Sequence, residues 1–268
     1  MTRMLWVITG MALLAMGFCG EMAVAADQVS VPVLVYHRFG PTVADSMTVT
    51  TAVFESQLKW LKANQYTVIP LRTLVNYLRG DGPPPPPKSV VITADDAHKT
   101  VYTEMLPLVR RYGIPVTLFI YPSAVSNASY AMTWEQLQEL KQTGQFDLQS
   151  HTYWHPNFKK DKKKLKPAEY QKEVDTQLAK SKRVLEKHFG TTVDLLAWPF
   201  GIYDDELEKD AAKAGYVTAF SIDRRNAGKS EKIMAEPRYL MVNGDGTKGF
   251  EAIVTGRAQE KGHKTYAQ

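Results

Sequence analysis

Short apolar runs rich in β-branched residues alternate with amphipathic stretches along most of this chain. The amphipathic stretches carry apolar residues at helical spacing, for example Phe54, Leu58 and Leu61. A helix between two strands returns the chain to the same edge of a sheet, so such strands pair in parallel. We expect eight strands, over residues 31–36, 66–69, 89–93, 116–121, 146–149, 194–198, 217–221 and 239–242.

The length of the chain limits how these strands can be arranged. With 268 residues and 44% hydrophobic side chains, the sequence suits one large core. Eight strands alternating with helices in one domain favour an α/β fold, a distorted (β/α) barrel of seven to eight parallel strands. An open, doubly wound sheet is the alternative. The prolines at 83–87 predict a stiff, extended connection, and Thr133 with Gln136 predicts a capped helix start.

The first 26 residues differ in composition from the rest of the chain. Arg3 precedes an uncharged run over residues 4–20, and small residues at 23–25 precede Asp27. This pattern predicts a secretory signal peptide over residues 1–25, and hence a protein that is exported, to the periplasm or the outside of the cell. An uncleaved membrane anchor is the alternative, because 17 uncharged residues reach the lower end of a bilayer span.

Cleavage after Ala25 has two consequences. It leaves one domain over residues 27–262 with no stable membrane span, and it removes Cys19, the only cysteine of the chain. The mature protein must then be stable in an oxidising compartment without disulfides. A lipoprotein attached at Cys19 is disfavoured, because Phe18 is bulky where such a site needs a small residue.

The charge balance narrows the range of partners. The formal net charge of +5 suits an anionic envelope polymer or membrane surface. Nucleic acid is not expected as a partner, because the lysine-rich stretch 159–166 lacks interleaved aromatic residues and contains Asp161. Such a stretch is typical of a solvated loop or helix start.

Candidate functional residues gather just after four of the expected strands. In parallel α/β folds, binding and catalytic groups collect at the carboxyl ends of the strands, because the loops there share one edge. The residues in these positions are His37 after the first strand, Asp95 and Asp96 after the third, His151 after the fifth, and Pro199 and Phe200 after the sixth. We therefore expect two acids and two histidines on one face of the fold.

Asp95, Asp96, His151 and His155 together suit a divalent metal. Adjacent carboxylates repel each other unless a positive charge lies beside them, and two histidines four residues apart can bind one ion. One carboxylate and two imidazoles leave coordination positions open, as in catalytic sites where the bound water has a pKa of about 7. The second carboxylate is then free to act as general base. The alternatives are a helix cap at the aspartates and simple packing of the histidines.

Three segments at these positions resemble a known family. Residues 92–97 (ITADDA), 150–155 (SHTYWH) and 198–201 (WPFG) resemble, in order and spacing, the first three motifs of the polysaccharide deacetylase, or NodB-homology, domains of carbohydrate esterase family 4. The resemblance extends over residues 31–245. It implies a NodB-type barrel and a hydrolase that removes acetyl groups from N-acetylhexosamine units of a polysaccharide.

The resemblance also implies a role for each residue of the cluster. Asp95 matches the family's catalytic base. Asp96, His151 and His155 match the ligands of a divalent metal, commonly zinc. The first motif therefore supplies both the base and one metal ligand.

The third motif implies substrate-binding residues. Pro199 and Phe200 match the segment that lines the acetyl pocket, where the Phe200 N–H would help the metal to hold the oxyanion. Many members begin this motif with an arginine that steers the base, where this chain has Ala197 and Trp198. Arg238 is the substitute that we expect at the site, and with Pro199 and Phe200 it is also expected to bind substrate.

Two further departures bear on the site. The first motif usually ends in glycine, where this chain has Ala97, and usually has a bulky residue in place of Ala94. Alanine at position 97 is tolerable only if the local φ is negative. The family's late histidine, its general acid, has no match near the C-terminus, since His263 lies in a polar tail. His37 fits instead, as in the permuted branch that includes poly-N-acetylglucosamine deacetylases, where the last motif comes first.

The sequence therefore predicts a monomeric, metal-dependent N-deacetylase of a polysaccharide, with Asp95 as base and His37 as acid. An alternative is a catalytically impaired carbohydrate-binding protein on the same fold, which is motivated by Ala94, Ala97 and the missing arginine. A glycoside hydrolase is the third candidate, because such enzymes also pair carboxylates in barrels. Adjacent aspartates, however, cannot by themselves straddle a glycosidic bond at the required separation.

Overall fold

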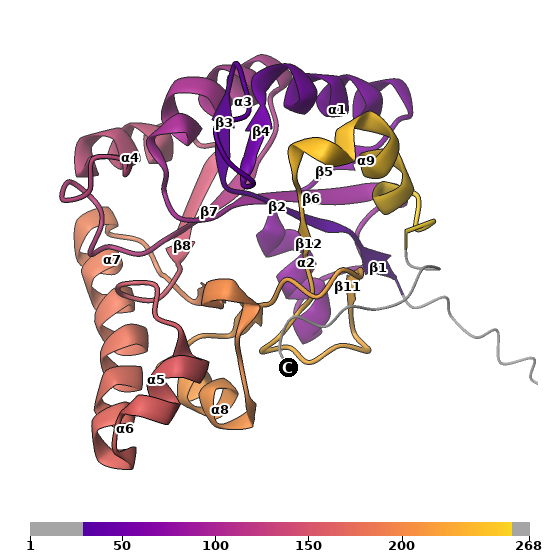
Figure 1. The fold of residues 1–268 in the computed structure, drawn as a ribbon. Helices are drawn as coiled ribbons and strands as arrows, with labels where there is room; N and C mark the ends of the chain where they lie inside the picture. The colour runs from indigo at the N-terminus through magenta and orange to yellow at the C-terminus, as the bar shows by residue number, and fades with distance from the viewer. Residues whose placement is uncertain (1–28, 259–268) are drawn as a thin grey trace, which may run out of the picture.

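The computed structural model describes residues 29–258, and a half-barrel of parallel strands forms its centre (Figure 1). The strand order is β10-β9-β8-β7-β6-β2-β12, and β5 pairs with the first residues of β6. The strands are β2 (Val33–Tyr36), β5 (Thr67–Val68), β6 (Ser89–Ala94), β7 (Val116–Ile120), β8 (Phe146–Ser150), β9 (Leu195–Ala197), β10 (Thr218–Phe220) and β12 (Tyr239–Leu240). The predicted distorted (β/α) barrel of seven to eight parallel strands is confirmed.

Each of the eight predicted strands corresponds to one strand of this sheet. The prediction missed the short strands β3 (Arg38–Gly40) and β4 (Thr48–Thr50), which pair in parallel with each other. It also missed β11 (Ala227–Gly228), which pairs antiparallel with β1 (Ser30–Val31). These strands have only two or three residues, too few to show a strand period in the sequence.

Both faces of the sheet are buried. Val33, Phe119 and Leu195 face inward, in one apolar cluster with Leu71 and Leu74 of helix α2 (Leu71–Arg79). Their neighbours along the strands, such as Leu34 and Leu118, belong to the larger cluster under the outer helices. Burial on both faces explains why the strands read as continuous apolar runs and not as an alternating pattern.

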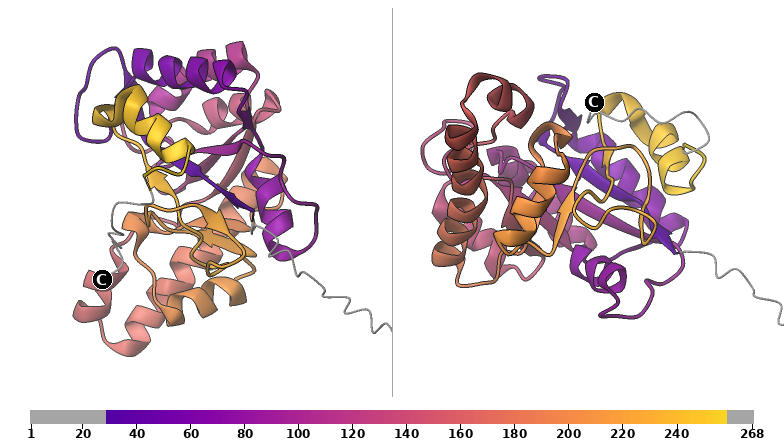
Figure 2. Two further views of the ribbon diagram at one scale, coloured as in Figure 1. Left: turned by 90° about the vertical axis from the view of Figure 1, so that its right-hand side faces the viewer. Right: turned by 90° about the horizontal axis from the view of Figure 1, so that it is seen from below.

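Helices surround the half-barrel. Helix α9 packs beside α1, with the rings of Trp60 and Phe250 5.9 Å apart, so the last described helix lies against the first (Figure 2). The helices besides α2 are α1 (Thr51–Ala63), α3 (Leu106–Tyr112), α4 (Trp134–Gln142), α5 (Phe158–Lys164), α6 (Pro167–Asp175), α7 (Ser181–Phe189), α8 (Asp205–Lys213) and α9 (Gly246–Val254). Shorter helical turns are η1 (Val101–Met105), η2 (Thr176–Lys180), η3 (Pro199–Gly201) and η4 (Asn243–Asp245).

Several local predictions are confirmed. The side chains of Thr133 and Gln136 form the predicted capping box at the start of α4. The lysine-rich stretch forms α5, whose lysines are exposed to solvent. The proline run 83–87 lies between α2 and β6 and adopts neither helix nor strand, as expected of a connection.

Some predictions fall outside residues 29–258. The signal peptide at 1–25, Cys19 and His263 lie outside the described residues, and the predicted domain over 27–262 extends past them at both ends. Within 29–258, none of the helices is sufficiently long and apolar to cross a bilayer.

Glu236 is a buried carboxyl group outside the predicted site. Burial raises its pKa to about 8; the Gly228 N–H and Arg225 oppose this shift, while the negative charge of Glu231 adds to it. Between pH 4.5 and 8 the folded chain therefore keeps a proton that the unfolded chain releases. Stability must fall as the pH rises through this window, because the unfolded state binds fewer protons.

We predict that Glu236→Gln removes this loss of stability with rising pH. From pH 5 to pH 8, the free energy of unfolding of the wild type should fall by about 2–4 kcal/mol relative to that of the variant. Urea unfolding at four pH values in this range measures the difference. Parallel pH profiles for the two proteins would show that Glu236 carries no proton in the folded state.

Candidate active site

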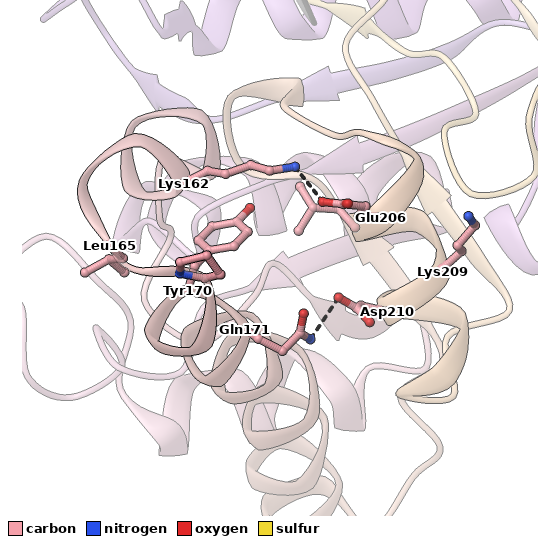
Figure 3. Close-up of a pocket in the computed structure, with 9 residues that line it drawn as sticks. Lys162, Leu165, Tyr170, Gln171, Glu206, Lys209 and Asp210 are labelled. Atoms are coloured by element: carbon pink, nitrogen blue, oxygen red, sulfur yellow. Dashed lines mark hydrogen bonds and ion pairs between the residues drawn. The ribbon is translucent and has the colours of Figure 1, made fainter.

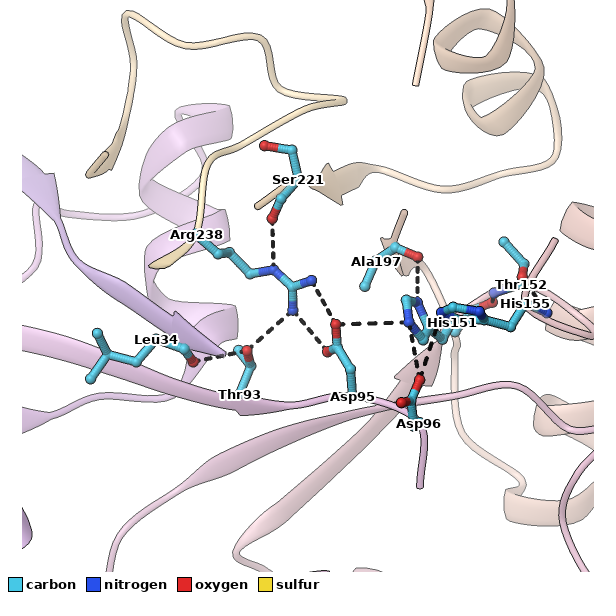
Figure 4. Close-up of polar contacts among 11 residues, drawn as sticks. Leu34, Thr93, Asp95, Asp96, His151, Thr152, His155, Ala197, Ser221 and Arg238 are labelled. Carbon is cyan, nitrogen blue, oxygen red and sulfur yellow. Dashed lines mark hydrogen bonds and ion pairs between the residues drawn. The ribbon is translucent and has the colours of Figure 1, made fainter. Parts of the chain in front are cut away.

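The carboxyl ends of strands in one sheet bring the predicted acids and histidines together, and Figure 4 shows four of them, Asp95, Asp96, His151 and His155. Asp95 and Asp96 follow β6, His151 follows β8, and His37 follows β2. These four side chains and that of His155 line one cleft of about 630 Å³. The strand-end placement predicted from the sequence therefore matches the observed geometry.

Asp96, His151 and His155 form a candidate metal site. Asp96 Oδ1 lies 3.6 Å from His151 Nε2 and 3.7 Å from His155 Nε2. One ligand atom from each residue lies within 4.8 Å of the others. The buried Asp96 Oδ1 accepts no hydrogen bond from the described residues, as expected of an atom that faces a cation. The residues present thus fit a divalent metal.

Both histidines direct Nε2 toward Asp96. His151 Nδ1 lies 2.8 Å from the carbonyl oxygen of Ala197. A carbonyl can only accept, so Nδ1 carries a proton, and Nε2 is the nitrogen that is directed at the site, as is typical of metal-binding histidines. Burial, together with the nearby His151, lowers the pKa of His155 to about 4, which favours its neutral form.

The backbone around the cleft is strained. Of the eight described non-glycine residues with positive φ, five belong to the three motifs. Such conformations cost free energy and persist only where the surrounding structure holds them, which is common at functional sites. The five are Asp96 (73°), Ala97 (55°), Thr152 (65°), His155 (60°) and Phe200 (56°).

Asp95 is held by Arg238. The guanidinium makes a bidentate ion pair with the carboxylate, with N–O distances of 2.9 and 2.7 Å. Burial alone would raise the pKa of Asp95, but the charge of Arg238, with smaller contributions from His151 and His37, lowers it to about 2. Arg238 also donates to the carbonyl of Ser221 and lies 5.2 Å from the centre of the Phe119 ring.

Two roles were expected for Arg238, to steer the base and to bind substrate, and its position favours the first. Its side chain is 0% exposed and lies behind Asp95. Arg238 is not among the residues that line the cleft, and its expected contact with substrate stays a prediction. Its bidentate contact with Asp95 suits the steering role expected of the arginine that the third motif lacks.

His37 and Phe200 occupy different parts of the cleft wall. His37 is buried, its Nδ1 has no hydrogen-bond partner among residues 29–258, and burial lowers its pKa. Phe200 is 52% exposed at the mouth of the cleft, with its ring 4.5 Å from that of His155. Pro199 is buried beneath it, next to Trp198, whose Nε1 donates to the carbonyl of Met234.

Several residues that line the cleft were not predicted from the sequence. Tyr121 directly follows β7, so its place at a strand end could have identified it. Its hydroxyl is 2.7 Å from that of Tyr130, and its ring lies 5.4 Å from that of His155. Arg38 and Ile222 also lie just after predicted strands, and Leu240 lies within one. Met47 comes from a segment with no recognisable pattern.

A second pocket, of about 580 Å³, lies between α5, α6 and α8 (Figure 3). Lys162 contacts Glu206, and Gln171 contacts Asp210. The hydroxyl of Tyr170 in the pocket wall has no hydrogen-bond partner among the described residues. The candidate metal-ligand group of the described residues lies in the other cleft and not in this pocket.

The fold and the site define an α/β half-barrel protein with a candidate Asp-His-His metal centre. The family profile described as polysaccharide deacetylase matches residues 82–219. The chain belongs to the polysaccharide deacetylase family, which confirms the resemblance inferred from the three motifs.

Individual relatives agree with this assignment. A Staphylococcus epidermidis protein named poly-β-1,6-N-acetyl-D-glucosamine N-deacetylase is 28% identical over 211 residues, which are 77% of this chain and 71% of the relative. The solved Streptococcus pyogenes deacetylase PplD superposes with a TM-score of 0.75 at 21% identity, covering 85% of this chain and 99% of that one. Ammonifex degensii IcaB superposes with a TM-score of 0.72 at 22% identity, covering 84% and 96%. At these identities the two structures show the shared fold.

Ala97 contradicts the expected backbone conformation. Alanine was expected to need a negative φ at this position, but its φ is +55°. An L-residue in the left-handed region costs roughly 1–2 kcal/mol, a cost that glycine avoids. The chain tolerates the strain here because Ala97 is buried and the Met132 N–H bonds to its carbonyl.

We predict that Ala97→Gly raises the free energy of unfolding by about 0.5–1 kcal/mol, since relief of strain exceeds the added freedom of the unfolded chain. Ala94→Gly is the matched control, because Ala94 is equally buried but lies in β6. That variant should lose stability. Urea unfolding of both variants is the measurement, and a destabilised Ala97→Gly would contradict the strain argument.

The Asp95–Arg238 pair predicts a large effect on stability. Arg238→Met leaves a buried carboxylate without its partner and should lower the free energy of unfolding by about 3–5 kcal/mol. The double variant Asp95→Asn, Arg238→Met should recover at least half of this loss, because no charge is then buried alone. Chemical denaturation of Arg238→Met, Asp95→Asn and the double variant measures the coupling, and additive losses would argue against a specific pair.

Proposed function

We propose that this protein hydrolyses the N-acetyl groups of a β-1,6-linked poly-N-acetylglucosamine. The observation that carries the proposal is the convergence of Asp96, His151 and His155 beside the ion-paired carboxylate of Asp95. The name of the Staphylococcus epidermidis relative supports the choice of polymer.

Zinc is the metal that we propose for the site, and Asp96, His151 and His155 would hold it. Two imidazoles and one carboxylate form a ligand set that zinc enzymes use when they keep a position open. Once bound, a divalent metal lowers the pKa of its water to about 7 and polarises the acetyl carbonyl. Asp95 would not be needed as a ligand, and Arg238 pairs with both of its oxygens.

Asp95 acts as general base in this proposal. Its pKa of about 2 keeps it ionised at neutral pH. The guanidinium uses only part of the acceptor capacity of the carboxylate, which offers about four lone-pair sites. The remaining lone pairs can accept a proton from the attacking water, while Arg238 fixes the direction in which they point.

His37 acts as general acid, and the part of the cleft wall around Phe200 binds the acetyl group. Attack of water on the acetyl carbonyl carbon forms a carbon–oxygen bond, and cleavage of the amide carbon–nitrogen bond then releases acetate. The amine nitrogen takes its proton from His37, which lines the same cleft as Asp95. The Phe200 N–H stabilises the oxyanion, and Pro199 with the Phe200 ring bounds the acetyl pocket.

Two observations support this reaction over the alternatives. The bidentate contact of Arg238 supplies the arginine that the third motif lacks, which removes one motive for a binding protein without catalysis. A glycosidase also needs a protonated carboxyl group as its acid, a role that the low pKa of Asp95 does not suit. The other carboxyl group that lines the cleft, Asp96, belongs to the candidate metal site.

The proposal extends to the setting of the reaction. The signal-like pattern at residues 1–25 supports export, a mature domain over 27–262, and action in the periplasm or outside the cell. We propose that the protein works as a monomer, because the side chains proposed for the reaction all come from a single chain.

We predict that zinc-loaded protein releases acetate from an oligomer of β-1,6-linked N-acetylglucosamine, with a mass loss of about 42 Da per unit. A strong chelator should abolish the release, and zinc should restore it. Asp95→Asn should lower kcat by about 10²- to 10⁴-fold, the usual contribution of a general base. Acetate detection and mass spectrometry provide the measurements.

Asp210→Asn is the matched control, because Asp210 lies in the second pocket, away from the cleft. This variant should keep wild-type activity. Equal activity with and without chelator, or full activity in Asp95→Asn, would refute the proposal. Glycan binding without any release of acetate would favour the binding protein instead.

A further inference from the structure

The loop between the two histidines of the metal site is held from behind by a buried glutamine. The N–H groups of Tyr153 and Trp154 both donate to Gln177 Oε1, each at a donor–acceptor distance of 3.0 Å. These residues lie between His151 and His155 in the sequence. Gln177 is 0% exposed and therefore contacts the loop from the interior of the protein.

This loop needs such support because its backbone is strained at both ends. Thr152 and His155 have φ values of +65° and +60°, in the left-handed region that non-glycine residues seldom adopt. The strain favours relaxation of the loop, which would move the His155 ring away from Asp96 and His151. Hydrogen bonds from a rigid element oppose this relaxation.

A second contact comes from the same helical segment. Ser181 Oγ donates to the carbonyl oxygen of Thr152 at a distance of 2.9 Å and lies 2.8 Å from Ser150 Oγ. Ser181 is also 0% exposed and lies one turn after Gln177. The loop is thus held at its N–H groups by Gln177 and at a carbonyl by Ser181.

The helix departs from regular geometry where it makes these contacts. The π-helical turn η2 (Thr176–Lys180) joins α6 to α7 and contains Gln177. A π-helical turn widens the helix by one residue, and such turns occur frequently at functional sites. Here the widened turn presents Gln177, and the first residue after it is Ser181.

The orientation of the Gln177 amide follows from its partners. Two N–H donors require an acceptor, so Oε1 faces the loop and Nε2 faces away. Nε2 has no hydrogen-bond partner among residues 29–258. The protein thus leaves a buried donor unpaired in order to keep the acceptor on the loop. Only the acceptor oxygen contributes to holding the loop.

We propose that Gln177 is a positioning residue for the metal centre, which sets the distance between His151 and His155 through the strained loop. The proposal rests on the metal site of the proposed function. Gln177 touches neither the metal ligands' side chains nor the cleft, and acts through the backbone of Tyr153 and Trp154.

The test compares the zinc affinity of variants by competition with a chromophoric chelator, a measurement that needs no turnover. Gln177→Met keeps the size of the side chain but removes the acceptor, and should raise the zinc Kd by about 10- to 100-fold, as loss of an outer-shell partner typically does. Gln177→Glu keeps an acceptor oxygen that can face the loop, and burial favours the neutral form of its carboxyl group, so this variant should bind zinc as tightly as the wild type.

Gln57→Met is the matched control. Gln57 is equally buried, and its Oε1 accepts from the Tyr36 hydroxyl while its Nε2 donates to the carbonyl of Gly246. This variant should lose stability without change in zinc Kd. If Gln177→Met does not fold, Ser181→Ala tests the same clamp and should also raise the Kd.

The outcomes separate this inference from the proposed function. A wild-type Kd in folded Gln177→Met, or an equal rise in Gln57→Met, would overturn the positioning role while leaving the deacetylase proposal intact. Failure of the wild-type protein to bind zinc would overturn the metal site itself. Weakened binding in Gln177→Met that Gln177→Glu restores would establish the role of the acceptor.

Discussion

The buried ion pair between Asp95 and Arg238 is the interaction on which the active-site face depends. Arg238 precedes β12, at one edge of the half-barrel, and donates to the carbonyl of Ser221, just after β10 at the other edge. Asp95 follows β6 in the middle. One guanidinium therefore joins three strand ends. Neither charge can be removed alone without leaving the other unpaired in the interior, so stability and the orientation of the base are coupled.

The metal site places a second constraint on the same face. Two of its ligands, Asp96 and His155, have left-handed backbone conformations, and the third, His151, precedes Thr152, which has one too. Such conformations are maintained only by surrounding contacts. On the β6 side, the Met132 N–H bonds to the carbonyl of Ala97. On the β8 side, Gln177 and Ser181 hold the loop from one helix. The strain and its support make the positions of the metal ligands a property of the whole fold.

Much of this architecture follows from the sequence. The eight apolar runs predict the strands because both faces of the sheet are buried, and the strand ends predict where the acids and histidines meet. The strands β3, β4 and β11 could not be predicted, because two or three residues carry no periodic signal. The conformation of Ala97 was wrongly predicted, because a left-handed alanine depends on contacts with residues distant in the sequence.

The sequence by itself determined the type of fold, the family, and the set of residues that suits a metal, because these depend on local patterns and on the chemistry of side chains. Only the tertiary structure decided how these residues share the work. Arg238, 143 residues after Asp95, is placed behind the base, where its side chain is buried. Gln177 is brought beneath the loop between two histidines. Such pairings arise from the packing of helices and strand ends around one core, which no spacing along the chain encodes.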